Sequence, residues 1–161
     1  MVKGSFTEEK ESMLPPSRLW KASIRDALNL LPKIMPEFTA SYQLLQGDGG
    51  VGSIRQLNCT PVFEDFTYVK DRVDIMDDEK HVFKCTVIEG GEIGRKLKSY
   101  SIEVQFQATS SGGCLSKMTV EYDTIKDSLL PEEEVAMRKE GIKWIGEALE
   151  AYLQANPDAY V

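Results

Sequence analysis

The chain is 161 residues long, a length typical of a single domain. It carries 19 lysine and arginine residues against 26 aspartate and glutamate residues, a formal net charge of −7. This acidic balance provides no basic surface for nucleic acid and no lysine- or arginine-rich face for an anionic membrane. The 42% content of hydrophobic residues is enough for a sizeable core. We therefore expect one domain over residues 1–161, with no nucleic-acid or membrane partner.

The cysteines and the first residues of the chain indicate the compartment. Cys59, Cys85 and Cys114 are widely spaced and form no CxxC pair, which argues against a disulfide framework and against structural zinc. No apolar run follows Met1 to Ser5, so the sequence shows no signal peptide. No window reaches the length of a membrane-spanning helix. The prediction is a cytoplasmic protein with reduced thiols, without a metal and without a cofactor.

The predicted elements begin with a strand over residues 3–13, which Pro15-Pro16-Ser17 ends. Apolar residues then recur at helical spacing and predict a short helix. A second short helix is expected to follow Asn29, with Pro32 near its start and Pro36 near its end. Together the two form a bent helical pair.

The middle of the chain is predicted to be a series of strands. Several short runs are separated by glycine, proline or acidic turns, over residues 40–46, 53–60, 66–75, 81–88, 98–108 and 114–123. Tyr100, Ile102, Val104 and Phe106 alternate with polar residues, so one face of that strand is apolar and the other is polar. This pattern indicates an antiparallel sheet with one side in water. Hairpin turns are expected at residues 77–80 and 110–113.

The last segment is the longest predicted helix, from about residue 131 to Asn156-Pro157. The acidic run Glu132–Glu134 lies at its positive N-terminal end, and apolar residues form one continuous stripe. The helix would have roughly 24 residues and be about 36 Å long. Gly141 and Gly146 cost about 1 kcal/mol each inside a helix. Either close packing against a strand or space for a ligand explains them. Strands and helices together make an α+β domain whose sheet curls round this helix.

A glycine-rich segment, Gly47-Asp48-Gly49-Gly50-Val51-Gly52-Ser53, joins two predicted strands. Its glycines can adopt positive φ and approach other groups closely. A phosphate-binding Walker loop needs Gly-Lys-Ser/Thr followed by a helix, whereas here a strand follows Ser53. Asp48 also places a negative charge where an anion would bind. The prediction is a rigid hairpin that shapes one wall of a binding cavity, in preference to a nucleotide site.

A set of motifs in one order spans nearly all of the chain. They are Leu31-Pro32-Lys33-Ile34-Met35-Pro36, residues 47–54, Tyr68-Val69-Lys70-Asp71-Arg72-Val73-Asp74, Val87-Ile88-Glu89-Gly90-Gly91, and Glu150-Ala151-Tyr152-Leu153 running into Asn156-Pro157-Asp158-Ala159-Tyr160. Together they resemble the plant pathogenesis-related class 10 proteins, relatives of the major birch-pollen allergen, with a monocot-like C-terminal end. The resemblance implies the helix-grip fold, in which a seven-stranded curved antiparallel sheet surrounds a long C-terminal helix and two short helices form a V.

The resemblance also implies a cytoplasmic defence- or stress-related protein with a large internal cavity for small hydrophobic or amphipathic plant metabolites. Cytokinins, flavonoids, other phenolics and sterol-like molecules are typical ligands, and a monomer or weak dimer is expected. The matched ligand-binding positions are Leu31, Leu57, Cys59, Tyr68, Phe83, Cys85, Tyr100, Ile102, Val104, Arg138, Gly141, Ile142 and Ile145. Cys59, Cys85 and Gly141 are smaller than the residues usual at their positions. They suggest a wider cavity, or one refilled by other side chains.

Ribonuclease activity, reported for parts of this family, is one alternative. Two of the proposed positions match Glu150 and Tyr152, but the other glutamate aligns with Lys98, and Arg55 supplies the basic residue after the glycine loop. Acid–base cleavage needs two groups with separated pKa values, and an acidic chain suits RNA poorly. We therefore expect Glu150 to bond a neighbouring backbone group or cation.

A cavity enzyme of specialised alkaloid or phenolic metabolism is the second alternative. Tyr68, Lys70, Arg72 and Arg138 could supply polar groups to such a site, without forming a distinctive catalytic signature. The single histidine, His81, is expected to be a solvated turn residue at a strand start, so no histidine-based catalytic set can be built. No catalytic residue is assigned, and a non-enzymatic ligand-binding protein is the preferred hypothesis.

Overall fold

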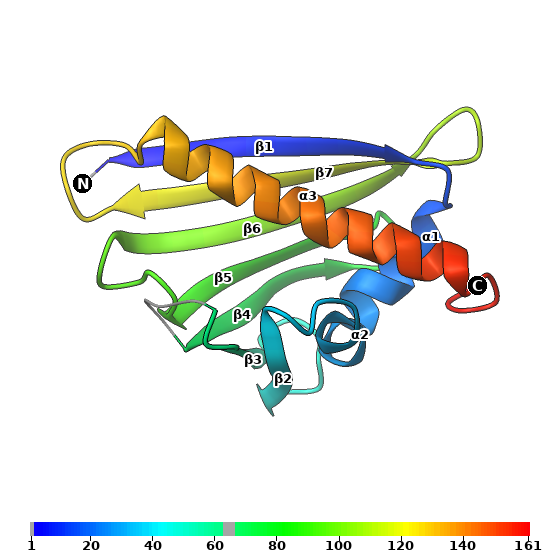
Figure 1. Cartoon of the computed structure of the whole chain (residues 1–161), viewed down its shortest axis with the longest axis horizontal. Helices are drawn as coiled ribbons and strands as arrows, with labels where there is room; N and C mark the ends of the chain where they lie inside the picture. Colours follow the sequence, from blue (N-terminus) through cyan, green and yellow to red (C-terminus); the bar gives the residue numbers. More distant parts are fainter. Residues whose placement is uncertain (1, 63–66) are drawn as a thin grey trace.

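The computed structural model describes residues 2–62 and 67–161. One seven-stranded sheet has the order β1-β7-β6-β5-β4-β3-β2, with antiparallel neighbours throughout. The strands are β1 (Lys3–Ser12), β2 (Thr39–Gln46), β3 (Ile54–Cys59), β4 (Tyr68–Asp77), β5 (Val82–Gly90), β6 (Leu97–Ala108) and β7 (Cys114–Thr124). Figure 1 shows helix α3 (Glu132–Ala155) lying across one face of the curved sheet. The predicted α+β architecture is confirmed.

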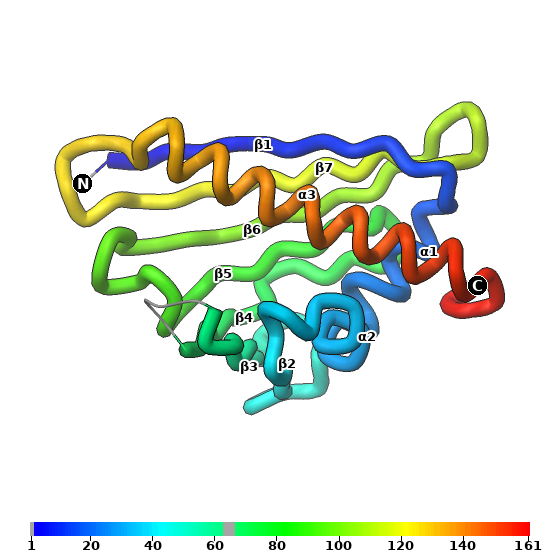
Figure 2. The backbone as a smooth tube through the Cα atoms, in the orientation of Figure 1, coloured from blue at the N-terminus to red at the C-terminus, as the bar shows by residue number. Residues whose placement is uncertain are grey.

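The bent helical pair consists of α1 (Pro16–Trp20), a π-helical segment (Lys21–Arg25) and α2 (Ala27–Ile34). It lies beside the C-terminal end of α3, as the backbone tube in Figure 2 shows. Two hydrogen bonds of 2.7 Å join this pair to the β4–β5 turn: Trp20 Nε1 donates to Asp78 Oδ1, and Arg25 donates to Asp78 Oδ2. The helices are therefore fixed to the sheet at the end where β4 and β5 meet.

The predicted strands are confirmed, with ends that shift by a residue or two. Residue 66 of the predicted strand 66–75 lies outside the described residues. The predicted start of the second short helix after Asn29 was wrong, because α2 begins at Ala27 and Pro32 lies inside it. The reason is local: the backbone carbonyl of Asp26 already accepts hydrogen bonds from the amides of Asn29 and Leu30.

Helix α3 is anchored firmly at its C-terminal end. Its buried residues are Leu149 and Leu153, whereas Trp144 and Ile145 are 49% and 40% exposed. The buried guanidinium of Arg18 donates hydrogen bonds to the carbonyl of Leu153, in the last turn of α3, and to the carbonyls of Asn156 and Ala159, which follow the helix. The carbonyl of Leu153 is one of those that a helix end leaves without a partner inside the helix. The middle of α3 therefore spans the sheet without being packed tightly into it. Within the described residues, no helix combines the length and the apolar character needed to cross a bilayer.

Candidate functional site

The buried apolar residues form two separate clusters. The larger one gathers around Trp20 and Leu30 beneath the helical pair and the end of α3. The smaller one gathers around Leu97 and Val120 beneath the N-terminal part of α3. The space that these clusters leave between the sheet and α3 is a cavity of about 430 Å³. Sites for small organic molecules occupy roughly 300–1,000 Å³, so this cavity is large enough to hold one.

Many of the predicted ligand-binding residues line this cavity. They are Leu31, Leu57, Phe83, Cys85, Ile102, Val104, Ile142 and Ile145. Strand alternation brings them together, because every second residue of the neighbouring strands β3 to β6 points towards α3. Leu31 comes from α2, and Ile142 and Ile145 come from α3. Their contact with a ligand stays a prediction.

Other predicted residues lie outside the cavity lining. Tyr68 is on the opposite face of β4, where its hydroxyl donates to Glu89 at 2.8 Å. Lys70 and Arg72 share that face, in ion pairs of 3.2 Å with Glu89 and 2.7 Å with Asp74. The cause is the two-residue period of the strand, which turns residues 69, 71 and 73 towards α3 instead.

Three of the four remaining predicted positions differ in their surroundings. Cys59 ends β3 opposite Thr39 and is half-buried. Tyr100 packs against the smaller apolar cluster, and burial raises its pKa to about 12. A Cβ added at Gly141 would meet no described atom within 4 Å, and one at Gly146 would meet only the Lys10 side chain, at 3.4 Å and beyond. Close packing against a strand therefore does not explain these two glycines.

A polar cluster is buried in the cavity wall formed by β2, β3 and β4. Arg55 Nε donates to Asp71 Oδ1 at 2.8 Å, and the Tyr42 hydroxyl donates to Asp71 Oδ2 at 2.8 Å. Only 7% and 8% of the Arg55 and Asp71 side chains are exposed. The guanidinium carbon lies 5.1 Å from the ring centroids of both Tyr42 and Phe83, a cation–π arrangement. Buried ion pairs are costly to desolvate, so this one is a candidate for function.

The other titratable groups of this cluster are neutral near pH 7. Burial raises the pKa of the Cys85 thiol to about 12. Burial also raises the pKa of Tyr42 well above its usual 10.0, against the opposing effect of the Arg55 charge. Arginine stays protonated at any ordinary pH. The cluster therefore combines one cation and one anion with a neutral phenol and a neutral thiol.

Tyr42, Arg55 and Asp71 were not among the predicted cavity positions. A signal for the pair was present in the alternation of β4, where Asp71 lies between Val69 and Val73 on the face that is otherwise apolar. Arg55 lies opposite Asp71 in the β3–β4 pairing. Two opposite charges at facing positions on the apolar side of neighbouring strands predict a buried pair.

The glycine loop is held by its own hydrogen bonds. Gly47, Gly49 and Gly52 have φ of +92°, +98° and +88°, values that favour glycine. The Gly49 amide donates to Ser53 Oγ at 2.8 Å, and the Gly50 amide donates to Asp48 Oδ1 at 2.9 Å. Backbone groups that could cradle a phosphate are thus already used.

The loop also connects to the rest of the sheet. The Gly52 amide donates to the Val73 carbonyl at 2.8 Å, and the Val73 amide donates to the Ser53 carbonyl at 2.9 Å. Residues 47–53 do not line the cavity, but Arg55 does. The expectation that the loop itself shapes a wall is therefore corrected: it positions the strand that carries Arg55.

The residues matched to the ribonuclease proposal make ordinary polar contacts. Glu150 forms an ion pair with Lys10 at 3.0 Å and accepts a hydrogen bond from Ser12 at 3.2 Å. The Tyr152 hydroxyl accepts from Lys33 Nζ at 3.4 Å. The expected cation next to Glu150 is therefore present, on strand β1.

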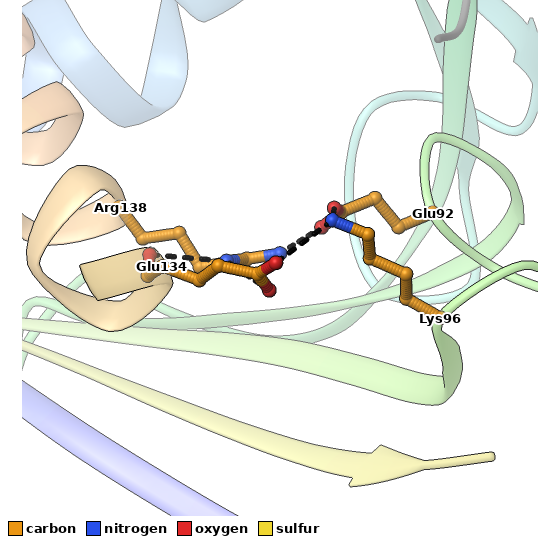
Figure 3. Close-up of polar contacts among 4 residues, drawn as sticks. All are labelled: Glu92, Lys96, Glu134 and Arg138. Carbon is orange, nitrogen blue, oxygen red and sulfur yellow. Dashed lines mark hydrogen bonds and ion pairs between the residues drawn. The ribbon is translucent and has the colours of Figure 1, made fainter. Parts of the chain in front are cut away.

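Four charged residues join the β5–β6 connection to the first turns of α3 (Figure 3). Arg138 forms an ion pair with Glu92, and Lys96 Nζ lies 3.0 Å from Glu134 Oε1. Arg138 also donates to the backbone carbonyl of Glu134 at 3.0 Å. Arg138 was a predicted ligand-binding residue, but its guanidinium is engaged in this ion-pair cluster. The cluster fixes the N-terminal part of α3 to the sheet.

His81 lies in the β4–β5 turn, as predicted, with a positive φ of 54°. It is not fully solvated, because its ring lies 5.4 Å from that of Trp20. Among residues 2–62 and 67–161, no group of three or more histidine, cysteine, aspartate or glutamate side chains could hold a metal ion.

A sequence model of the pathogenesis-related protein Bet v 1 family matches residues 1–156. The chain is 40% identical over 159 residues to the major strawberry allergen Fra a 1.07 of Fragaria ananassa. This match covers 98% of this chain and 99% of the relative. It is 40% identical over 163 residues to pathogenesis-related protein 1 of Asparagus officinalis, covering 100% of both chains.

Two solved structures share the arrangement of strands and helices. The crystal structure of Ara h 8.0201 superposes with a TM-score of 0.84 at 28% identity, covering 96% of this chain and 99% of that one. A point mutant of norcoclaurine synthase from Thalictrum, bound to a transition-state analogue, superposes with a TM-score of 0.80 and covers 98% of both chains. Its identity is 21%, so this second likeness concerns the fold alone.

Proposed function

Because the chain belongs to the pathogenesis-related protein Bet v 1 family, we propose that it binds a small hydrophobic or amphipathic molecule between the sheet and α3. The observation that carries this proposal is the cavity of about 430 Å³, whose walls are mostly aliphatic and aromatic side chains. Arg55 and Asp71 are its buried charged residues. An apolar pocket with a few convergent polar groups is typical of small-molecule sites.

The ligand is proposed to be a plant metabolite, such as a cytokinin, a flavonoid, another phenolic or a sterol-like molecule. A role in plant defence or stress is supported by the name of the asparagus relative, pathogenesis-related protein 1. A cytoplasmic location and a monomeric or weakly dimeric state belong to the same proposal.

Ribonuclease activity has weaker support. Glu150 is already paired with Lys10 and Ser12, and Lys98 takes the place of the second proposed glutamate. General acid–base cleavage needs two titratable groups near one substrate atom. A cavity enzyme is also less favoured, because the buried acid of the cavity, Asp71, is bound to Arg55 and Tyr42 and is not available as a base.

A neutral, environment-sensitive dye such as Nile red tests the proposal. The dye should bind the folded protein with micromolar affinity, and Ile142→Trp should abolish binding because the indole fills the cavity that Ile142 lines. Met137→Trp is the matched control, since Met137 is 74% exposed on the same helix and should leave binding unchanged. Dye binding that is absent from the wild type, or that survives Ile142→Trp with folding intact, contradicts the proposal.

The ribonuclease alternative is decided by Glu150→Gln. Wild type and variant, purified in parallel, should both lack RNA cleavage above the background of the preparation. An activity that follows the wild type and disappears in the folded variant would support the nuclease instead. Native mass spectrometry of protein from its own tissue would then identify a retained ligand.

A further inference from the structure

The Arg55–Asp71 pair carries no net charge, although it is the polar centre of the cavity wall. The two side chains are joined at 2.8 Å and are almost fully buried. Tyr42 and Cys85, which surround the pair, are neutral near pH 7. A ligand group that arrives here meets a neutral polar surface rather than an uncompensated cation.

Arg55 retains hydrogen-bond donors for such a group. Its Nε–H is used by Asp71, whereas a guanidinium has five N–H donors in all. A second N–H of Arg55 donates to the Cys85 sulfur, which leaves at most three donors for a ligand group. Because Arg55 lines the cavity, these donors are accessible from within it.

The aromatic rings beside Arg55 restrict how a ligand can approach. The guanidinium carbon lies 5.1 Å from the ring centroids of Tyr42 and Phe83. The N–H groups lie in the plane of the guanidinium, so a ligand oxygen reaches them from the edge. The Asp71 oxygens can accept a further hydrogen bond there, since a carboxylate has about four acceptor positions.

We propose that Arg55, Asp71 and Tyr42 select ligands that present a neutral hydroxyl or amide group, and that they discriminate against carboxylates of the same shape. This inference rests on the proposed function and names the ligand chemistry of that cavity. A neutral group accepts from Arg55 and donates to Asp71 or Tyr42. A carboxylate has no donor, and it brings a second negative charge to a site where Asp71 already neutralises Arg55.

The desolvation of a carboxylate decides the direction of this selectivity. An ion that leaves water must be compensated by a partner of opposite charge. Here the attraction to Arg55 is offset by the repulsion from Asp71, so most of the desolvation cost remains. A neutral hydroxyl or amide group loses less solvation free energy on burial, and it regains hydrogen bonds with Arg55, Asp71 or Tyr42.

Isosteric ligands test the proposal on the wild-type protein. Naphthalene-2-carboxamide, naphthalene-2-carboxylate and 2-naphthol are compared near pH 7 by displacement of Nile red and by calorimetry. The carboxamide and the naphthol should bind at least about tenfold more tightly than the carboxylate. Equal or tighter binding of the carboxylate overturns the selectivity, while dye binding itself still supports the cavity. Absence of all binding, including that of the dye, overturns the proposed function as well.

Asp71→Asn supplies the converse test, because it leaves the Arg55 charge uncompensated. The preference for carboxamide over carboxylate should fall by about tenfold or reverse. Asp74→Asn is the matched control: Asp74 lies on the same strand, pairs with Arg72 at 2.7 Å and does not line the cavity. The preference of Asp74→Asn for carboxamide over carboxylate should equal that of the wild type. Equal changes in both variants overturn the proposal; if Asp71→Asn does not fold, the wild-type comparison decides.

Discussion

Arg55 and Asp71 lie directly opposite each other on neighbouring strands, and their side chains form a 2.8 Å ion pair on the face that α3 covers. The register of β3 and β4 therefore builds the pair, and the hydrogen bonds of Gly52 and Ser53 with Val73 continue that register into the glycine loop. The same arrangement places a charged group in the wall of an otherwise apolar cavity. Sequence, register and site are connected through these two residues.

Stability should depend strongly on keeping both partners of this pair. Arg55→Met leaves Asp71 buried without its cation, so the free energy of unfolding should fall by about 3–5 kcal/mol. The double variant Arg55→Met/Asp71→Asn should recover part of this loss, because no buried charge remains. Urea unfolding of the wild type, both single variants and the double variant measures the coupling.

The exposed pair Arg72–Asp74 is the control for that cycle. Its distance is 2.7 Å, but 47% of the Arg72 side chain is exposed. Exposed pairs contribute about 0–1 kcal/mol, so Arg72→Met and Asp74→Asn should show little coupling. A coupling energy as large as that of Arg55 and Asp71 would show that burial does not set the strength of the pair.

Most of the fold could be predicted from local patterns. Three short-range signals each correspond to an observed element. They are the alternation in residues 98–108, the proline and glycine turns, and the apolar stripe of the last helix. The start of α2 was predicted less well, because the carbonyl of Asp26 begins this helix without a proline or a capping side chain. Such a start leaves no clear trace in the sequence.

The cavity could be predicted only in part. Inward-facing strand residues such as Phe83 and Val104 follow from alternation. The direction of the Arg138 side chain does not follow from any local pattern, because it depends on the ion pair with Glu92 in the β5–β6 connection. Tyr68 was placed by resemblance, while the strand period turns it to the opposite face. Whether Gly141 meets a strand or open space depends on how far α3 lies from the sheet, and no local pattern encodes that distance.

Alkaline pH should destabilise the protein through the buried thiol of Cys85. Burial raises its pKa to about 12, whereas an unfolded thiol has a pKa of about 8.5. Between these values the unfolded chain has lost the proton and the folded chain has kept it. The unfolded state then binds fewer protons, so the free energy of unfolding decreases as pH rises. From pH 8 to pH 10 the loss from this group should be on the order of 1–2 kcal/mol.

Cys85→Ala isolates that contribution. The substitution lowers stability at every pH by removing buried atoms, but it should also flatten the decline between pH 8 and pH 10 in reducing buffer. Urea midpoints at a series of pH values measure the slope. An unchanged slope would show that the Cys85 thiol ionises alike in both states.

The ion-pair cluster of Figure 3 should stabilise the first turns of α3. Glu134 lies 3.0 Å from Lys96, and its backbone carbonyl accepts from Arg138. Glu134→Gln should therefore cost about 0.5–1 kcal/mol, and the loss should shrink as salt is added. Glu133→Gln is the matched control, because it removes a neighbouring charge from the same turn. Both variants should lose the same favourable interaction with the helix dipole, about 0.3 kcal/mol. Hydrogen exchange in residues 132–140 should quicken more in Glu134→Gln than in Glu133→Gln; equal effects of the two would contradict the role of the cluster.

The glycine loop gives a matched pair of substitutions. Gly47 has a φ of +92°, and a Cβ added there would lie 2.5 Å from Ser53 Oγ and 2.9 Å from Ser53 Cα. Gly47→Ala should therefore reduce the free energy of unfolding by about 2–3 kcal/mol. Gly50 has no positive φ, and its added Cβ would meet only Asp48 Oδ1, at 3.2 Å. Gly50→Ala should then cost less than about 1 kcal/mol.

Urea unfolding compares the two loop variants, and ATP titration separates a structural loop from a nucleotide site. A structural loop predicts the unequal stabilities and no ATP binding, because the Gly49 and Gly50 amides already donate to Ser53 and Asp48. A nucleotide site predicts saturable ATP binding that both substitutions abolish, and that Asp48→Asn strengthens by removing a negative charge. Chemical-shift changes confined to residues 47–53 on addition of ATP would therefore overturn the structural role, whereas an unchanged spectrum together with a selectively destabilised Gly47→Ala supports it.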